Sequence, residues 1–318
     1  TDSSSLIKTE EIQSLWSGYG SISRYRTSGS KQKNIVIKHV QLPEKVYHPK
    51  GWQSDLSHQR KIRSYAVESV WYRDYAKQCS ETCRVPKTLG LAQHDQEFLI
   101  ILEDLNESGF TERKHTATIN EMRSCLKWLA NFHATFMEIP PKNLWPVGTY
   151  WHLDTRPDEL NALEDMPLKS AARKINDVLN SCRYQTFVHG DAKLANFCFS
   201  ASGDKVAAVD FQYVGGGCGI KDVAYFIGSC LDEEDCYRYE SQLLDYYFNE
   251  LNLALSETKP FINSTAIEKE WRYLYPIAWT DFHRFIKGWS NGHWKIHGYS
   301  ERLAQQVIQM LSDKTSLK

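Results

Sequence analysis

Hydrophobic residues in the first third of the chain gather in short runs that are separated by polar turns. The stretch 34–38 reads Asn-Ile-Val-Ile-Lys, a β-branched run that ends in a lysine. Two further apolar runs, at 85–91 and 98–102, are joined by a polar turn at 93–96. β-Branched and aromatic runs bounded by polar turns are typical of strands. We therefore predict a small antiparallel sheet in this part of the chain.

Two longer stretches repeat their hydrophobic residues at helical spacing. The first spans 57–78. The second follows Thr118, a residue type that caps helix starts, and ends before Pro140 and Pro141. Its apolar face comprises Met122, Cys125, Leu126, Leu129, Phe132, His133 and Phe136. We therefore predict that His133 is a packed core residue rather than a catalyst.

Length and element order predict an α+β protein with two lobes. The chain has 318 residues, which is longer than one average domain. Strand patterns lie before residue 105, whereas helical patterns dominate after it. We predict one lobe of residues 1–105 that holds the sheet, and a larger, mainly helical lobe of residues 106–318.

Composition and charge narrow the class of protein. Hydrophobic residues make up 42% and charged residues 24%, with a formal net charge of −1, as in ordinary globular proteins. A nucleic-acid partner would favour a basic surface, so we expect none. No apolar run reaches membrane-spanning length, and residues 1–11 lack a signal-peptide core. The 8 cysteines are scattered without zinc-site spacing, which predicts free thiols and a cytoplasmic location.

The richest chemistry lies in Phe187–Asn196, where an apolar strand runs into a loop containing Asp191, Lys193 and Asn196. A second apolar strand then ends at Asp210. Phosphoryl transfer needs a carboxylate that orients and deprotonates the acceptor hydroxyl, and oxygen ligands for Mg²⁺. A His-Gly-Asp tripeptide alone is equally typical of a structural turn. The loop that contains Asp191 and the strand that ends at Asp210, in this order and spacing, together favour phosphoryl-transfer chemistry.

A turn of small residues near the N-terminus is a candidate phosphate-binding loop. Such a turn lets backbone N–H groups approach phosphate oxygens closely. Ser23 replaces the third glycine of a G-x-G-x-x-G pattern, and a plain hairpin is the alternative. The candidate residues are Ser17, Gly18, Gly20 and Ser21.

Lys38 ends the β-branched strand that follows this turn, so it is a second candidate for binding phosphate. The alternative for Lys38 is an ordinary edge lysine. Glu68, in the predicted helix 57–78, is our candidate to pair with Lys38. Glu44 and Asp55 are competing carboxylates, and an exposed helix carboxylate is the alternative for Glu68.

These motifs resemble the aminoglycoside phosphotransferase and choline kinase superfamily, which has the protein-kinase-like fold. The resemblance is closest to the ecdysteroid-kinase-like branch, and it spans roughly residues 17–229. The residues that carry it are His189-Gly190-Asp191 with Asn196, Asp210-Phe211-Gln212, Asp222-Val223-Ala224-Tyr225-Phe226, Glu103-Asp104-Leu105 and Leu129–Ala134.

The resemblance implies a bilobal enzyme that binds ATP and Mg²⁺ between its lobes. Asp191 would be the catalytic base, and Asn196 and Asp210 would bind Mg²⁺. Lys38 would hold the α- and β-phosphates, braced by Glu68.

The resemblance also implies roles for residues around this centre. Backbone groups of Glu103 and Leu105 would face the adenine edge, and His189 would buttress the catalytic loop. Lys193 stands where the ecdysteroid-kinase-like branch often has an aromatic residue. Protein kinases have a lysine there that reaches the γ-phosphate, so Lys193 is a catalytic candidate.

The segments after Asp210 give further expectations. Gly215–Gly219 looks like a flexible, short substitute for an activation segment. Asp222 is expected to cap the apolar helix that it begins and to anchor the catalytic loop. An acidic run at 232–235 is interpreted as a helix start rather than a site for cationic substrates.

An aromatic-rich stretch at 270–299 is the only hint of the substrate. Its rings suit a quaternary ammonium group or a flat apolar alcohol, and helix packing is an equally good explanation. The rings are those of Trp271, Tyr273, Tyr275, Trp279, Phe282, Trp289 and Trp294.

The sequence therefore predicts an ATP-dependent phosphotransferase that acts on a hydroxyl of a small molecule. The acceptor would be steroid-like, an amino alcohol or aminoglycoside-like. A protein kinase is disfavoured by the His-Gly-Asp loop and the short glycine-rich segment. A nucleotide-binding pseudokinase or scaffold is disfavoured because Lys38, Asp191, Asn196 and Asp210 are all present.

Overall fold

The structure, a computed structural model, describes residues 5–15, 18–29, 32–41, 55–95 and 97–313. Its internal contacts divide the chain into two compact units. The first unit contains Thr1–Arg113 and Cys198–Gln212, and the second contains Lys114–Phe197 and Tyr213–Lys318. We predicted one boundary after residue 105, whereas the contacts put residues 106–113 and Cys198–Gln212 in the first unit.

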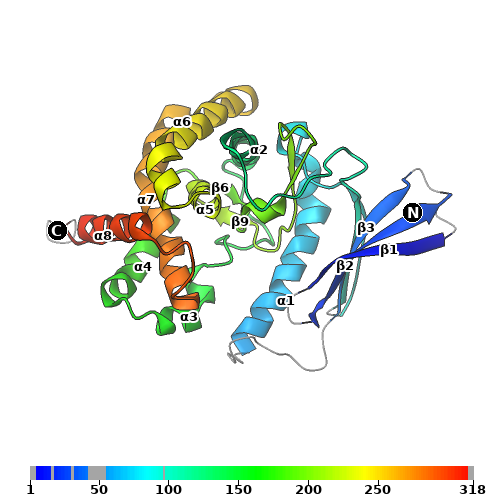
Figure 1. The fold of residues 1–318 in the computed structure, drawn as a ribbon, viewed down its shortest axis with the longest axis horizontal. Coiled ribbons are helices and arrows are strands. Elements are labelled where there is room, and N and C mark those ends of the chain that lie inside the picture. The colour runs from blue at the N-terminus through cyan, green and yellow to red at the C-terminus, as the bar shows by residue number, and fades with distance from the viewer. Residues whose placement is uncertain (1–4, 16–17, 30–31, 42–54, 96, 314–318) are drawn as a thin grey trace. The chain divides into compact units, whose positions relative to one another are not determined.

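The first unit contains an antiparallel sheet with the strand order β1-β2-β3-β5-β4 (Figure 1). The β-branched run forms the middle strand, on which Ile35 and Ile37 are buried. Strand β4 begins three residues later than the predicted start at 85, because Pro86 has no N–H to donate to a ladder. The strands are β1 (Ser5–Ser14), β2 (Gly20–Ser28), β3 (Asn34–Val40), β4 (Thr88–His94) and β5 (Glu97–Glu103).

Helix α1 (Asp55–Val70) confirms the predicted helix and packs against this sheet. Tyr65 on α1 joins a buried cluster with Val40 of β3 and Phe98 of β5. Burial of these side chains fixes the helix on the strand that carries Lys38. The chain continues as a π turn (Trp71–Tyr75) and the short 3₁₀ turns Ala76–Gln78 and Glu81–Cys83.

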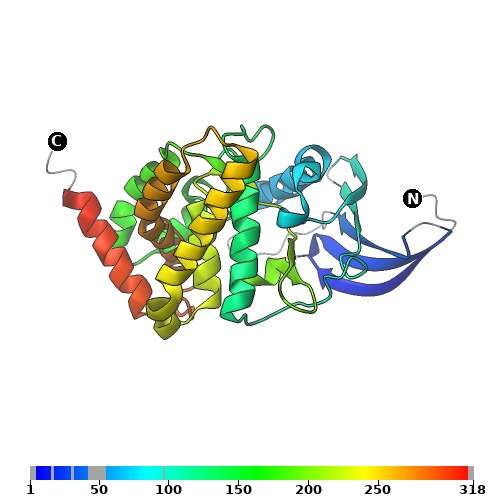
Figure 2. The same ribbon diagram turned by 90° about the horizontal axis from the view of Figure 1, so that it is seen from above.

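The second unit is mainly helical, as predicted. Helices α2 and α6 pack side by side, a pairing that Figure 2 shows along most of α2. Asp232 caps the start of α6 by accepting a hydrogen bond from the Asp235 N–H at 2.9 Å, so the acidic run is a helix start. The helices are α2 (Ile119–Phe136), α3 (Pro157–Ala162), α4 (Met166–Asn180), α5 (Ile220–Cys230), α6 (Glu233–Thr258), α7 (Ser264–Trp289) and α8 (Gly298–Asp313).

Helix α2 begins where the sequence predicts. The Thr118 hydroxyl accepts a hydrogen bond from the Glu121 N–H, and the Glu121 carboxylate accepts one from the Thr118 N–H at 2.8 Å. This capping box satisfies two backbone donors at the helix start. His133 is fully buried on the apolar face of α2, which confirms that it belongs to the core.

The glycine run that follows Asp210 forms a buried strand, so the prediction of a flexible segment at Gly215–Gly219 is wrong. Gly215–Gly217 forms β9, which pairs antiparallel with β6 (Thr186–Val188). A methyl group on Gly215 would come within 2.2 Å of the Trp145 carbonyl oxygen. Glycine is needed here for close backbone approach rather than for motion. Two further short strands, β7 (Phe197–Phe199) and β8 (Val206–Ala208), pair with each other.

Two general expectations can be compared with the described residues. In this part of the chain, no helix is both long and apolar enough to cross a membrane. The eight cysteines, all within the described residues, are free thiols.

We predict that Gly215→Ala destabilises the protein by about 1–3 kcal/mol, the usual penalty for overpacking a tight interior. The added methyl group would collide with the Trp145 backbone, which cannot swing aside as a side chain can. Urea unfolding would measure the change in free energy. Gly292→Ala is the matched control, because nothing lies within 4 Å of its added methyl group. Equal stability of the two variants would contradict the prediction.

Candidate active site

The candidate residues form two sets, one in each compact unit. The set in the first unit centres on Lys38, whose Nζ donates to Glu68 Oε2 at 2.6 Å and lies 3.6 Å from Asp210 Oδ1. Lys38 is 4% exposed and Glu68 is 2% exposed. The predicted pair of Lys38 and Glu68 is therefore present, while the competing Glu44 lies outside the described residues.

The carboxylates beside Lys38 keep its side chain charged. Burial by itself would lower the pKa of Lys38, but Glu68 and Asp210 outweigh burial and raise the pKa above its ordinary value. A lysine that stays cationic on a fixed strand is suited to bind phosphate oxygens.

Asp210 is held in an unusual backbone conformation next to Lys38. Its φ is +68°, in the left-handed region that non-glycine residues rarely adopt. Gln212 Nε2 donates to Asp210 Oδ1 at 2.7 Å, and Gln212 Oε1 accepts from Lys61 Nζ at 2.9 Å and Ser64 Oγ at 3.1 Å. Gln212 thus ties the Asp210 loop to helix α1, the helix that also carries Glu68.

Gln212 was not among the predicted site residues. The feature that could have pointed to Gln212 is its place after Asp210 and Phe211, where protein kinases have the glycine of an Asp-Phe-Gly motif. Its two partners on α1 are far away in sequence, so only the fold reveals the link.

The small-residue turn lies between β1 and β2, as predicted. Gly18 and Gly20 both have positive φ, of +74° and +128°. A methyl group on Gly20 would come within 2.0 Å of the His39 carbonyl oxygen, so the turn needs glycine there. Ser21 lies on β2 opposite His39, and Ser17 is outside the described residues. A phosphate-binding role for these residues stays a prediction.

The predicted hinge follows β5 directly. The Glu103 carboxylate accepts a hydrogen bond from the Lys87 N–H at 3.0 Å and pairs with the buried Arg84 guanidinium. The Leu105 carbonyl accepts from the N–H groups of Ser108 and Phe110 at 3.1 and 3.0 Å. The Leu105 carbonyl is therefore used within a turn, and contact of Glu103 and Leu105 with adenine stays a prediction.

The set in the second unit centres on Asp191. Lys193 Nζ donates to Asp191 Oδ2 at 3.0 Å, and Asn196 Nδ2 donates to Asp191 Oδ2 at 3.1 Å and to its carbonyl at 2.7 Å. These contacts leave the Asn196 amide oxygen as a candidate metal ligand. The loop therefore brings together the three residues that the sequence placed in it.

Asp222 fixes the backbone of this loop from helix α5. Its carboxylate accepts from the His189 N–H at 2.5 Å and the Gly190 N–H at 3.0 Å, and it lies 3.2 Å from His133 Nε2. The predicted anchoring is confirmed. The predicted N-cap is wrong, because Gly219 occupies the cap and Asp222 lies in the first turn of α5.

His189 is fully buried, and its Nδ1 accepts a hydrogen bond from the Asp191 N–H at 3.3 Å. This contact supports the loop backbone, as the sequence suggested, and leaves the Asp191 carboxylate to other partners.

Two tyrosines beside Asp191 are further candidates. Tyr225 donates its hydroxyl proton to Asp191 Oδ1 at 3.1 Å, and the Tyr150 hydroxyl lies 3.3 Å from that of Tyr225. Burial raises the pKa of Tyr225 well above its ordinary value, so the hydroxyl stays protonated. The position of Tyr225, one helical turn after Asp222, could have predicted that Tyr225 lies near the catalytic loop. No feature of the sequence around Tyr150 predicted its contact with Tyr225.

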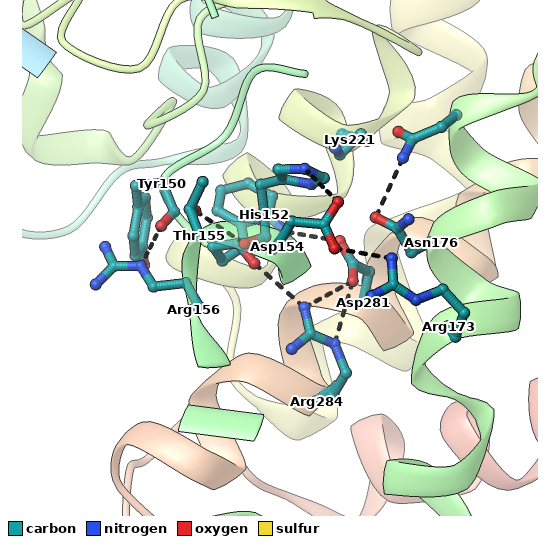
Figure 3. A network of polar contacts seen from close by, with 12 residues as sticks. Tyr150, His152, Asp154, Thr155, Arg156, Arg173, Asn176, Lys221, Asp281 and Arg284 are labelled. Carbon is teal, nitrogen blue, oxygen red and sulfur yellow. Dashed lines mark hydrogen bonds and ion pairs between the residues drawn. The ribbon is translucent and has the colours of Figure 1, made fainter. Parts of the chain in front are cut away.

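A buried polar network holds the segment that carries Tyr150 (Figure 3). The Asp281 carboxylate accepts from Trp151 Nε1 at 3.0 Å and from the Arg284 guanidinium at 2.9 Å, and Arg284 also donates to the Trp151 carbonyl at 3.2 Å. Arg156 Nε donates to the Tyr150 carbonyl at 2.5 Å. The Tyr150 N–H donates to the Gly190 carbonyl, so the network continues into the catalytic loop.

Most rings of the aromatic-rich stretch pack the helical core. Trp271, Tyr275, Trp279 and Phe282 are buried on α7. Tyr273 and Trp294 are exposed. Helix packing therefore accounts for the greater part of this stretch.

Each unit contributes one oxygen donor of the type that Mg²⁺ takes. Within the described residues, no group of three His, Cys, Asp or Glu side chains converges as a metal site. Mg²⁺ is usually held by one or two carboxylates together with phosphate oxygens and waters. The Asp210 carboxylate and the Asn196 amide oxygen are donors of the required type.

One family of sequences and several solved structures are similar to this chain. A sequence model of the ecdysteroid kinase-like family matches residues 26–142 and 149–259, which is more than half of the chain. No curated protein matches the chain significantly.

Solved structures of similar fold cover almost the whole chain. One is an amicoumacin kinase in complex with AMP-PNP and Ca²⁺, with 11% identity and a TM-score of 0.51 over 98% of this chain and 88% of that one. Another is a microcompartment-associated aminopropanol kinase, with 13% identity and a TM-score of 0.50 over 98% of this chain and 91% of that one. At these identities the likeness shows the fold alone, and it confirms the predicted kinase-like α+β class.

We predict that Gln212→Leu loosens the Asp210 loop from helix α1. Loss of a buried hydrogen-bond partner costs about 1–3 kcal/mol, so the melting temperature should fall by several degrees. Amide hydrogen exchange around residues 61–64 should also accelerate. Gln93→Leu is the control, because Gln93 is exposed on β4. Unchanged exchange on α1 would show that Gln212 does not hold the loop.

Proposed function

Because this chain belongs to the ecdysteroid kinase-like family, we propose that it transfers the γ-phosphate of Mg-ATP to a hydroxyl group of a small molecule. Family and fold identify it as a small-molecule phosphotransferase. Our proposal adds three points to this identification: the donor nucleotide, the metal and the class of acceptor. The acceptor is a steroid-like, amino-alcohol or aminoglycoside-like hydroxyl compound.

The observation that carries this proposal is the environment of Asp191. Its carboxylate takes hydrogen bonds from Lys193, Asn196 and Tyr225, on a backbone that Asp222 anchors. A general base must be held in hydrogen-bonding reach of the proton that it removes, and such fixed geometry serves that purpose.

In the proposed reaction, Asp191 accepts the proton of the acceptor hydroxyl. The acceptor oxygen forms a bond to the γ-phosphorus while the bond from the γ-phosphorus to the bridging oxygen breaks, and ADP leaves with that electron pair. Lys38, braced by Glu68, binds the α- and β-phosphates, and Lys193 neutralises charge on the transferred group.

Asn196 and Asp210 would hold Mg²⁺, with the glycine turn and the hinge contributing backbone contacts to the nucleotide. When bound, the metal neutralises charge on the phosphate oxygens. The hydrogen bond from Gln212 holds the carboxylate of Asp210, one of the two candidate metal ligands, in place.

The eight free thiols support a cytoplasmic location, which is part of this proposal. A pseudokinase or scaffold would lack one of the reactive groups. Lys38, Asp191, Asn196 and Asp210 are all present, and Lys38 pairs with Glu68 as proposed for a phosphate-binding lysine.

We predict that Asp191→Asn lowers turnover about 10²–10⁴-fold, the usual contribution of general-base assistance, without loss of nucleotide binding. ATP consumption would be measured over a panel of steroids, amino alcohols, aminoglycosides and sugars. The control is Asp313→Asn at the exposed end of α8. Near-normal turnover by Asp191→Asn would reject Asp191 as the base.

We predict that Asp210→Ala weakens Mg²⁺-dependent nucleotide binding more than about tenfold, since even the loss of outer-shell partners weakens metal binding that much. Fluorescent-nucleotide titrations at several Mg²⁺ concentrations would measure it. Asp204→Ala, at an exposed carboxylate in the same segment, is the control. Unchanged affinity at every Mg²⁺ concentration would exclude Asp210 as a ligand.

A further inference from the structure

Lys295, in the loop between α7 and α8, points its ammonium group at aromatic rings near Asp191. Its Nζ lies 4.8 Å from the centre of the Tyr225 ring, 5.2 Å from that of Phe282 and 5.6 Å from that of Trp294. The faces of aromatic rings attract cations. The position that a quaternary ammonium ligand would take among these rings is therefore held by the protein's own lysine.

This ammonium group makes no direct ion pair or hydrogen bond in the part of the chain that the structure describes. The Asp191 carboxylate acts on its charge from a greater distance. Burial lowers the pKa of Lys295 to about 8, although Cys230 and Asp191 act to raise it, and Lys193 acts in the same direction as burial. A half-buried cation that no carboxylate contacts directly is costly, so an anion placed beside Lys295 would be stabilised.

One tyrosine ring connects Lys295 to the proposed base. The hydroxyl of Tyr225 donates to Asp191 Oδ1 at 3.1 Å, while the face of its ring carries the Lys295 ammonium group. Tyr225 therefore contacts both the proposed base and the ammonium group.

The surroundings suit a flat, apolar skeleton. The Tyr150 ring packs edge-on against the rings of Tyr225 and Phe285, with centres 5.7 and 5.3 Å apart. The Trp151 ring packs against those of Tyr150 and Tyr225, and its Nε1 donates a hydrogen bond to the Asp281 carboxylate.

We propose that Lys295 selects the acceptor: it binds a carboxylate or similar anionic group on a flat hydroxyl compound and disfavours acceptors that carry an ammonium group there. This inference rests on the proposed phosphotransferase function and on Asp191 as the base. It narrows the range of acceptors to aromatic or alicyclic alcohols that bear an acidic group about one ring away from the reacting hydroxyl.

Three probes with one skeleton test this selection: para-(hydroxymethyl)benzoate, para-methylbenzyl alcohol and para-(aminomethyl)benzyl alcohol. We expect the kcat/KM of the acid to exceed that of the amine at least about tenfold, as for a hydrogen bond to a charged group. Lys295→Met should remove the preference, and Lys295→Glu should invert it. Lys269→Met, which removes an exposed lysine from α7, should leave it unchanged.

Binding of the same probes to the Asp191→Asn variant with ADP, followed by ligand-observed NMR, separates this inference from the proposed function. Acid-selective binding that Lys295→Met abolishes supports the role of Lys295 even without turnover. Equal binding of acid and amine, or a preference that survives Lys295→Met, overturns it and shows that Lys295 only packs against the rings. Failure of every hydroxyl compound to accept phosphate would count against the proposed function instead.

Discussion

The buried carboxylate of Asp222 is the contact on which the catalytic loop depends. Both of its oxygens accept backbone N–H groups, from His189 and Gly190, in a region without solvent. Removing such a carboxylate would leave two buried donors without partners, which is expensive in a medium of low dielectric. His133, on another helix, orients Asp222, so the loop is fixed by the packing of α2 against α5. The positions of Asp191, Lys193 and Asn196 follow from this anchor.

In the first unit, buried polar contacts likewise fix the candidate phosphate-binding residues. A buried pair of Lys38 and Glu68 fixes a cation on a strand, and Gln212 fixes a carboxylate beside it. Both contacts lead to helix α1, which packs on the sheet through Tyr65. Burial makes these polar contacts strong, and apolar packing holds the elements that carry them. The geometry of the phosphate-binding candidates is therefore a consequence of how α1 sits on the sheet.

The residues that adjoin Asp191 in the second unit include several aromatic rings. Tyr150, Tyr225 and Phe282 pack against one another, and a network of Asp281, Arg284 and Trp151 lies behind them. The faces of such rings attract cations, and the ammonium group of Lys295 occupies that place. In the proposed selection, its positive charge favours an acidic group on the acceptor over an ammonium group.

The sequence by itself determined whatever depends on neighbours in the chain. Asp191, Lys193 and Asn196 share one loop, so their spacing alone brings them together, and the caps and apolar faces of the helices are equally local. Lys38 and Glu68 were paired correctly because a strand and the next helix in such a fold adjoin. The tertiary structure decided what depends on distant contacts: that Gly215–Gly217 is a buried strand, that Gln212 binds α1, and that Lys295 meets Tyr225. Burial and close packing between remote segments set these features, and no local pattern of residues encodes them.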